Sequence, residues 1–397
     1  MHYEQWISYR YLTSNKGKFL AFLNIISIAG VALGVTALIV VIGVMTGFGN
    51  NLREKIIGTT PHIMVEKEGG VADFEGVRKK LQGIYSVENT SPYIQGNIFI
   101  EKFNQARAIA VRGIIPREEK NITKVDQYLV KGRFDDLNGN QIIIGSELAK
   151  FFGYALGDEV ALVTPGTGGA GEGGAYSLVV SGIFTTGVMD YDTNLVLVHF
   201  TKAQEMFGFL PNVTMGIGVK LSDPEKATEV KEKIYGILGY NFSVHSWIDN
   251  NRPLFDALFL EKWGLFIILT FIVIVASFNI ISTLIVTVTS KIHDIGVLLA
   301  LGVPRVSIKK IFTQQGMFLG FLGVFWGLVG GGSISYILKT FIKVPSEIYA
   351  IDHVPVVIEL KDVLIIVAAA LVITYLSTIY PAYRAAKLEP VEALRYE

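Results

Sequence analysis

The sequence predicts an α-helical membrane protein with four transmembrane helices and a large α+β domain inserted between the first and second of them. Hydrophobic residues make up 51% of the 397 residues and charged residues only 18%, and the mean hydropathy is +0.45. A soluble chain of this length would carry more charge. Four runs that lack charged residues and histidine have the roughly 20 apolar residues that a helix needs to cross about 30 Å of hydrocarbon. They are Phe22–Met45, Gly264–Thr289, Gly316–Leu338 and Val363–Tyr383.

The first run is predicted to remain in the membrane as an anchor. Arg10, Lys16 and Lys18 precede it, as in a signal peptide, but its apolar stretch exceeds an h-region of about 7–15 residues and no clear small-residue cleavage site follows. The formal net charge is zero, so composition indicates no attraction to nucleic acid. The chain has no cysteine, which excludes disulfides and thiolate metal sites but does not identify a compartment.

Lys and Arg residues predict the orientation, because short cytoplasmic segments carry an excess of them. The segments predicted to be cytoplasmic contain Arg10, Lys16, Lys18, Lys291, Arg305, Lys309, Lys310, Arg384, Lys387 and Arg395. The short loop on the other side contains Lys339, Lys343 and Lys361 together with Glu347, Asp352 and Glu359. Both termini and the 291–310 loop are therefore expected in the cytoplasm, and the long segment 48–262 outside.

The outside segment is predicted to be folded, because strand and helix signals alternate along it. Its first part has the strand patterns HIMVEK and NIFIEKF, with helical spacing at Phe74, Val77 and Leu81. Its last part runs from the strand pattern MGIGVKL to FSVHSW, with a helix between them that has Asp223 as N-cap and Pro224 at its first position.

These signals predict a split α/β part at 60–115 plus 213–250. A β-rich insertion at 116–212, dense in short strand patterns, is expected to interrupt it. Within the insertion, the tract TPGTGGAGEGG at 164–174 lacks the Gly-Lys-Ser/Thr ending of a phosphate loop, and a strand pattern follows it where a phosphate loop would have a helix. We expect a mobile hairpin tip, since glycine is the default turn residue; the alternative is a tip that orders on binding a partner.

No energy source is predicted within the chain. Walker A, HExxH and GxSxG sequences do not occur. The 6 histidines are scattered singly, whereas a metal needs several converging ligands, so no metal site is expected. The spans also lack the ionisable residues that ion-coupled pumps carry inside the membrane. The energy for any transport must therefore come from another chain.

The loop between the second and third spans has a helical pattern of its own. Steps of three and four connect Ile292, Ile295, Leu298, Leu299 and Gly302. Gly302 can take a left-handed conformation and Pro304 cannot continue a helix, so the helix is expected to end there. Two hypotheses stay open: a handle by which a soluble partner moves the two spans, or an interfacial helix that lies on lipid without a partner.

Three long stretches carry a family resemblance. They read YRYL…IISIAGVALGVTALIVVIGVMTGFGNNLREKIIGTTPH near the beginning, FNIISTLIVTVTSKIHDIGVLLALG around the loop helix, and YPAYRAAKLEPVEALRYE at the end. They resemble the lipoprotein-releasing ABC transporter permeases of the LolC/LolE family, within the wider FtsX/MacB-type permease superfamily. The likeness covers nearly the whole chain and preserves the order of the motifs.

The resemblance implies a multi-pass permease of the inner membrane of a Gram-negative bacterium, with the outside domain in the periplasm. It implies that two permeases pair, as a homodimer or with a LolC/LolE-type paralogue. A LolD-like ATPase dimer would drive them through the helix after the second span. That ATPase would bind ATP and Mg, so this chain would have no cofactor and no enzyme activity. The cargo would be lipoproteins, extracted from the outer leaflet and passed to a LolA-like periplasmic carrier.

The sequence departs from the family pattern at two places. Ile292 and Leu299 stand where basic residues are common in the loop helix, so the ATPase is expected to dock through the apolar face and Asp294. The carrier-binding hook of LolC is a longer proline-containing hairpin, whereas this chain has the glycine tract, which indicates a hookless partner type or a self-pairing permease. Two other functions stay open: a MacB-like exporter of another cargo, and an FtsX-like transmembrane regulator of periplasmic hydrolases.

Three sets of residues are expected to carry the function. The ATPase-coupling helix would use Asp294, Ile295, Leu298, Leu301 and Gly302. Bulky aliphatic faces of the first two spans would line a cavity for lipid or lipoprotein where this permease meets a second one. The residues expected to line it are Leu33, Val40, Met45, Phe48, Ile268, Phe271, Ile272 and Val275. Residues that face lipid have the same character. Glycines three or four positions apart in the third span allow close helix packing; the alternative is loose packing with lipid in the grooves. These glycines are Gly316, Gly320, Gly323, Gly327 and Gly331.

The expected segments follow from these signals. They are an N-terminal amphipathic segment at 1–21, the first span at 22–47, the periplasmic domain at 48–262, the second span at 263–289, the coupling helix at 290–310, the third span at 314–340, a short periplasmic loop at 341–361, the fourth span at 362–383 and a cytoplasmic tail at 384–397.

Overall fold

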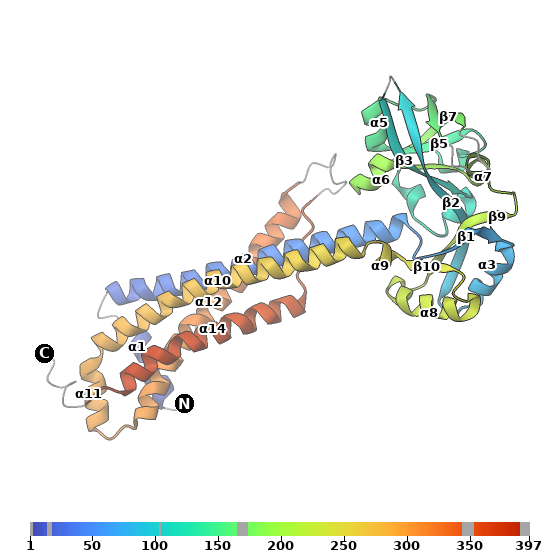
Figure 1. Cartoon of the computed structure of the whole chain (residues 1–397). Helices are drawn as coiled ribbons and strands as arrows, with labels where there is room; N and C mark the ends of the chain where they lie inside the picture. The colour runs from blue at the N-terminus through green and yellow to red at the C-terminus, as the bar shows by residue number, and fades with distance from the viewer. Residues whose placement is uncertain (1–2, 14–17, 103–104, 165–173, 344–352, 390–397) are drawn as a thin grey trace. The chain divides into compact units, whose positions relative to one another are not determined.

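The computed structural model describes residues 3–13, 18–102, 105–164, 174–343 and 353–389. They form two compact units, shown in Figure 1. The helical unit takes its residues from 1–49, 256–343 and 353–397, and the α+β unit comprises 50–255. The boundaries between the units fall inside two long helices, α2 (Lys18–Thr59) and α10 (Arg252–Ser290).

Within its described residues, the helical unit contains four helices that are long and apolar enough to cross a membrane. They are α2, α10, α12 (Arg305–Phe341) and α14 (Leu360–Ala386). Each is longer than the apolar run that predicts it, because hydropathy marks where the hydrocarbon begins and ends, whereas the backbone hydrogen bonds of a helix continue through the charged residues beyond. Residues 256–262, assigned from the sequence to the outside domain, belong to α10 and the helical unit.

Two shorter helices of the described residues lie at one end of the bundle. α1 (Tyr3–Thr13) packs against α12, and α11 (Ile292–Ala300) joins α10 to α12. Gly302 ends the α11 turn with a φ of 87°, in the left-handed region that favours glycine. The N-cap of α12 is Pro304. The two residues that predict the end of the loop helix thus have the conformations that the prediction assigns to them.

In the part of the α+β unit that the structure describes, ten strands form one connected sheet. The strands are β1 (Ile63–Ala72), β2 (Val87–Lys102), β3 (Gln105–Ile114), β4 (Leu129–Gly132), β5 (Gln141–Gly145), β6 (Glu159–Val163), β7 (Ala175–Phe184), β8 (Leu195–His199), β9 (Val213–Leu221) and β10 (Ser243–Ser246). The α-helices are α3 (Phe74–Gln82), α4 (Pro116–Glu119), α5 (Ser146–Phe152), α6 (Met189–Asn194), α7 (Phe200–Phe207), α8 (Ala227–Leu238) and α9 (Trp247–Asn250). Short 3-10 helices are η1 (Val125–Tyr128), η2 (Phe134–Asp136) and η3 (Pro224–Lys226).

The strands form two regions that share β2. The first half of β2, Val87–Tyr93, pairs with β9, and with β1, β10, α3 and α8 it encloses one hydrophobic core. The second half, Ile94–Lys102, pairs with β3, and the strands β2, β3, β8, β5, β7 and β6 close on one another in a ring around a second core. β4 adds to β7 beside this ring.

The expected division at 115/116 therefore differs from the structure. β3 belongs with the β-rich region, and the boundary lies inside β2, near Tyr93 and Ile94. Strand patterns mark where strands are, but strand pairing depends on partners far away in the chain, which periodicity does not reveal. The predicted start of the helix between β9 and β10 agrees with the structure. Asp223 accepts a hydrogen bond of 3.0 Å from the Glu225 amide, and Pro224 begins the turn η3 that leads into α8.

Candidate transport and coupling surfaces

One face of α10 is apolar and exposed along the middle of the helix. Ile268, Phe271, Ile272 and Val275 are 48–64% exposed, and all four belong to the predicted cavity set. The opposite side of the helix faces the bundle, where Val273, Ala276 and Ile280 are buried. The exposed side is therefore the one that a lipid, a cargo or a second protein can cover.

The predicted cavity residues of α2 are less uniform. Leu33 is 69% exposed, whereas Val40, Met45 and Phe48 are half-buried. α2 also packs on α10 through its glycines: a Cβ on Gly34 would lie 2.8 Å from a methyl of Val273. Of the predicted cavity residues, those of α10 are therefore more exposed than those of α2.

The glycines of α12 lie where neighbouring helices approach closely. A Cβ on Gly316 would meet Thr378, and one on Gly320 would meet Thr374, both in α14. The other three face α2, where a Cβ on Gly323, Gly327 or Gly331 would lie 2.6–2.8 Å from the Cβ atoms of Val31, Val35 and Ile39. One helix thus contacts two others through a row of glycines, which is the role expected of small residues at interfaces between membrane helices.

The loop helix α11 is partly embedded in the chain itself. Ile295 is fully buried in a cluster with Val288, Ile308, Ile311, Phe312, Ala382 and Ala385. The hypothesis that Ile295 inserts into an ATPase is therefore corrected: its side chain already packs against α10, α12 and α14. The helical period that predicts one apolar face cannot tell whether that face contacts the chain's own helices or a partner.

The side of α11 that remains open carries different residues. Leu301 is 77% and Val297 39% exposed, while Leu298 is half-buried. Asp294 forms an ion pair of 2.9 Å with Lys291 and is 44% exposed. Of the predicted coupling residues, Leu301 and Asp294 remain accessible beside Gly302. Leu298 packs in part against the cluster around Ile295 and in part lines the groove beside α1.

A groove between α1 and α11, of about 520 Å³, is a feature that sequence reasoning missed. It is lined by Trp6, Ile7, Arg10, Tyr11, His293, Asp294, Val297 and Leu298. The Lys291 ammonium lies 5.1 Å from the centre of the Tyr11 ring, and burial, together with the nearby Asp294 carboxylate, raises the pKa of Tyr11 to about 12. The two helices are about 280 residues apart in the chain, so no local pattern could have brought them together.

Helix α1 turns its aromatic side outward. Tyr3, Trp6 and Tyr9 are 49–53% exposed, while Glu4 and Ser8 are buried. The Tyr3 hydroxyl donates a hydrogen bond of 2.8 Å to the Ser307 Oγ of α12. The side of α1 on the protein is mixed, since Ile7 and Tyr11 pack there beside Glu4 and Ser8. The exposed Tyr3, Trp6 and Tyr9 suit a membrane interface, where Trp and Tyr are enriched.

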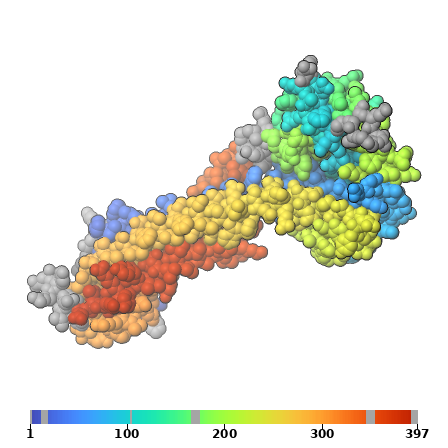
Figure 2. Space-filling model, in the orientation of Figure 1, coloured from blue at the N-terminus to red at the C-terminus, as the bar shows by residue number. Residues whose placement is uncertain are grey.

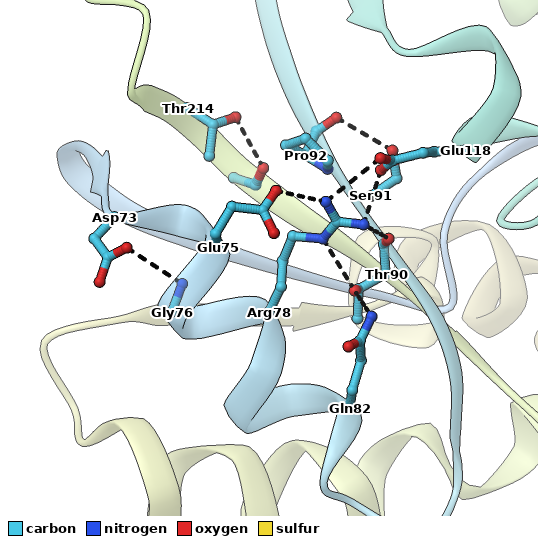
Figure 3. A network of polar contacts seen from close by, with 11 residues as sticks. Asp73, Glu75, Gly76, Arg78, Gln82, Thr90, Ser91, Pro92, Glu118 and Thr214 are labelled. Carbon is cyan, nitrogen blue, oxygen red and sulfur yellow. Dashed lines mark hydrogen bonds and ion pairs between the residues drawn. The ribbon is translucent and has the colours of Figure 1, made fainter.

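A network of polar contacts connects the two regions of the α+β unit (Figure 3). The Arg78 guanidinium of α3 lies 2.8 Å from Glu75 and 2.9 Å from Glu118 in the β-rich region. It also donates to the Thr90 carbonyl oxygen of β2 at 2.8 Å. One side chain thus joins α3, the shared strand and the segment after β3.

Two buried polar groups stabilise the same unit. Arg112 and Glu119, only 5% and 3% exposed, form an ion pair of 3.2 Å. The Leu221 amide donates a hydrogen bond of 3.0 Å to the Nδ1 of the buried His62, and burial lowers the pKa of His62 to about 4.

The glycine tract of the β6–β7 hairpin lies, for residues 165–173, outside the described residues. At its two ends, the Thr164 amide donates to the Gly174 carbonyl oxygen at 3.0 Å, and the Gly174 amide donates to the Thr164 Oγ1 at 2.9 Å. Among the described residues, no group of three or more His, Asp or Glu side chains is arranged to hold a metal ion.

Comparison with known proteins identifies the class of the chain. Residues 25–236 match the MacB-like periplasmic core domain family, and residues 266–390 match the FtsX-like permease C-terminal family. The chain is thus an FtsX-like permease with a MacB-like periplasmic domain.

The relatives narrow this class. The chain is 33% identical to the lipoprotein-releasing system transmembrane protein LolC of Neisseria meningitidis serogroup B, over 99% of both chains. It is 26% identical to LolE of Haemophilus influenzae over 98% of both. The crystal structure of the periplasmic region of MacB from Actinobacillus actinomycetemcomitans is similar at 13% identity and a TM-score of 0.34, covering 50% of this chain and 94% of that one. The chain belongs to the LolC/LolE family of lipoprotein-releasing permeases.

Proposed function

We propose that this chain is the permease subunit of an ABC transporter that extracts lipoproteins from the outer leaflet of the inner membrane and hands them to a periplasmic carrier. The observation that carries the proposal is the likeness, over the full length, to relatives named as lipoprotein-releasing proteins. Hydrolysis of ATP, with its Mg, is assigned to a separate ATPase, and this chain acts without catalysis.

The proposed topology has α2, α10, α12 and α14 as the membrane spans. The excess of Lys and Arg in the short segments supports cytoplasmic termini and a cytoplasmic α11. The MacB-like domain is then inserted between the first and second spans and lies in the periplasm of a Gram-negative cell. The spans predicted from the sequence, such as 22–47 and 263–289 for the first two, are assigned to the part of each helix that lies within the hydrocarbon.

The surfaces described above supply the contacts of the proposed assembly. The ATPase docks on α11 through Leu298, Leu301 and Asp294, next to the groove beside α1. A second permease, either a copy of this chain or a LolC/LolE-type paralogue, packs along α2 and α10. The acyl chains of the cargo then lie against the exposed face of α10, where Phe271 and its neighbours are open.

Purification of the chain from native membranes, under conditions that keep complexes intact, tests this function. We expect one ATPase, a second LolC/LolE-type permease chain (the same or another) and lipid-modified proteins in the purified sample. A periplasmic adaptor together with an outer-membrane duct would instead identify an exporter. A periplasmic cell-wall hydrolase without any lipoprotein would identify a regulator.

A further inference from the structure

Three helices of the bundle meet at a compact polar cluster. The Lys262 ammonium of α10 lies 2.8 and 3.1 Å from the two carboxylate oxygens of Asp362 in α14. It also donates a hydrogen bond of 3.0 Å to the Thr46 Oγ1 of α2, and this hydroxyl lies 3.2 Å from Asp362 Oδ2. Each group therefore contacts the other two in a closed triangle. Figure 2 shows α10 (yellow) and α14 (red) as neighbours on the surface of the helical unit.

The surroundings of this cluster are apolar. Thr46 is 8% exposed, and the side chains of Asp362 and Lys262 are 17% and 32% exposed. A cavity of about 160 Å³ borders the pair, and the remaining residues that line it are Ile42, Phe259, Trp263, Phe266, Ile365 and Ile366. Separating the helices would remove the ion pair and its hydrogen bonds while both charges stay beside apolar side chains, which is unfavourable.

A second contact holds the beginning of α14 at the same place. The Val357 amide, in the segment before α14, donates a hydrogen bond of 3.0 Å to the Gly43 carbonyl oxygen of α2. One turn further along α2, a Cβ on Gly47 would collide with the Pro355 carbonyl. The chain that enters α14 thus lies directly on the backbone of α2, on the side where the polar cluster forms.

Lys262 lies on the side of α10 that faces α2 and α14, where its contacts oppose separation of α10 from α14. The exposed face around Phe271 and Val275 lies on one side of this helix, whereas Lys262 contacts α2 and α14 on the side that faces the bundle. A force on the exposed face, from a cargo or from a second permease, would pull α10 away from α14. The polar cluster resists that separation because its three contacts are short and would be lost together.

We infer that Lys262, Asp362 and Thr46 are positioning residues that form a three-helix lock, which makes α14 move as one body with α2 and α10 while the transporter works. This inference rests on the proposed function for its consequence in transport, but the lock itself is a property of the helices. Without these three contacts, α10 is expected to move under the force from the cargo while α14 stays in place. Less cargo is then released for each ATP hydrolysed.

Spin labels test the lock without reference to cargo. The chain has no cysteine, so Leu260→Cys and Leu364→Cys, at positions that are 73% and 59% exposed on α10 and α14, can be labelled selectively. In the complex purified from membranes, we expect one narrow distance distribution that is the same without nucleotide and with ADP–vanadate trapped. Asp362→Asn is expected to broaden it or to separate the two states. A wild-type distribution that itself changes between the two states overturns the lock.

Release per ATP hydrolysed tests the consequence. We expect Lys262→Met and Asp362→Asn to lower this ratio roughly fivefold or more, and the exchanged pair Lys262→Asp with Asp362→Lys to recover most of it. Lys361→Met, which removes the exposed lysine next to Asp362, is the matched control and should leave the ratio unchanged. A structural role alone would lower protein yield and both activities together, with the ratio unchanged, and that result contradicts the inference.

The two measurements separate two kinds of failure. Absence of release from the wild-type complex, with a distance that stays constant between states, would end the proposed function and keep the lock. Normal release with a distance that varies between states would keep the function and end the lock. Variants that do not accumulate in the membrane leave the wild-type distance measurement as the deciding test.

Discussion

Replacing Gly327 in α12 with alanine should destabilise the helical unit, although alanine is the better helix former. The new Cβ would lie 2.6 Å from the Cβ of Val35 and 3.0 Å from the Ala32 carbonyl oxygen. Both atoms belong to the main body of α2 and cannot turn away as the end of a flexible side chain could. The methyl group therefore fits only if α12 and α2 move apart.

The magnitude follows from two opposing effects. Alanine in a helix interior gains about 1 kcal/mol over glycine, and overpacking of a well-packed contact costs about 1–3 kcal/mol. Gly332, in the same helix, is the matched control, because a Cβ there would meet no atom within 4 Å apart from the nearby backbone of its own helix. Gly332→Ala should therefore stabilise, and the difference between the two variants isolates the overpacking, at about 1–3 kcal/mol.

Reversible unfolding of the purified chain in mixed micelles, with increasing denaturing detergent, measures both variants on one scale. We expect Gly332→Ala to unfold at a higher detergent fraction than the wild type, and Gly327→Ala at a lower one than both. Equal shifts for the two variants would refute the reasoning, since propensity would then be the whole effect and the close approach of α12 to α2 would not exist.

Further predictions concern α11 and the α+β unit. Leu298→Asp should abolish association with the ATPase, measured by co-purification, while the level of the permease in the membrane stays normal. An unpaired carboxylate in an apolar interface costs more than the roughly 1.5–3 kcal/mol of the lost leucine contact. As a control, Lys309→Ala removes an exposed charge and should change binding by less than about 1 kcal/mol. Acidification from pH 7 toward 4 should cost about 3 kcal/mol of folding stability at His62. The unfolded chain takes up a proton near pH 6.5, whereas the folded chain does so only near the depressed His62 pKa of about 4. Thermal melts across this range should show a weaker pH dependence for His62→Gln than for the wild type, and an unchanged pH dependence would contradict the assignment. Glu119→Gln should cost about 3–5 kcal/mol, because it leaves the buried Arg112 charge uncompensated; a loss below about 1 kcal/mol in chemical unfolding would show that the pair is open to water.

The sequence was sufficient for features that depend on local chemistry. Apolar runs free of charge locate the four helices of the described residues that are long and apolar enough to cross a membrane, and Gly302 with Pro304 marks the end of α11. The glycine spacing of α12 predicts close helix packing. It does not reveal that Gly316 meets α14 while Gly323 meets α2, because the partner of a helix face is set by the whole bundle.

Other features depend on residues far apart in the chain. The burial of Ile295 requires α10, α12 and α14 to converge on α11, and an apolar period has the same form whether a protein core or a partner covers it. Lys262 and Asp362 mark the ends of two apolar runs in the sequence, where charged residues are common. Only the fold shows that they meet, with Thr46, in one cluster.

The central claim, that the chain uses an ATPase partner to release lipoproteins, is tested most directly in proteoliposomes. The purified complex is reconstituted with a fluorescent triacylated lipoprotein, and the soluble fraction is assayed for that lipoprotein in the presence of a periplasmic lipoprotein carrier. The account predicts release that requires both ATP and the carrier, and that is lost with Leu298→Asp. ATP hydrolysis at an unchanged rate, with the lipoprotein remaining entirely in the membrane under all conditions, would contradict it.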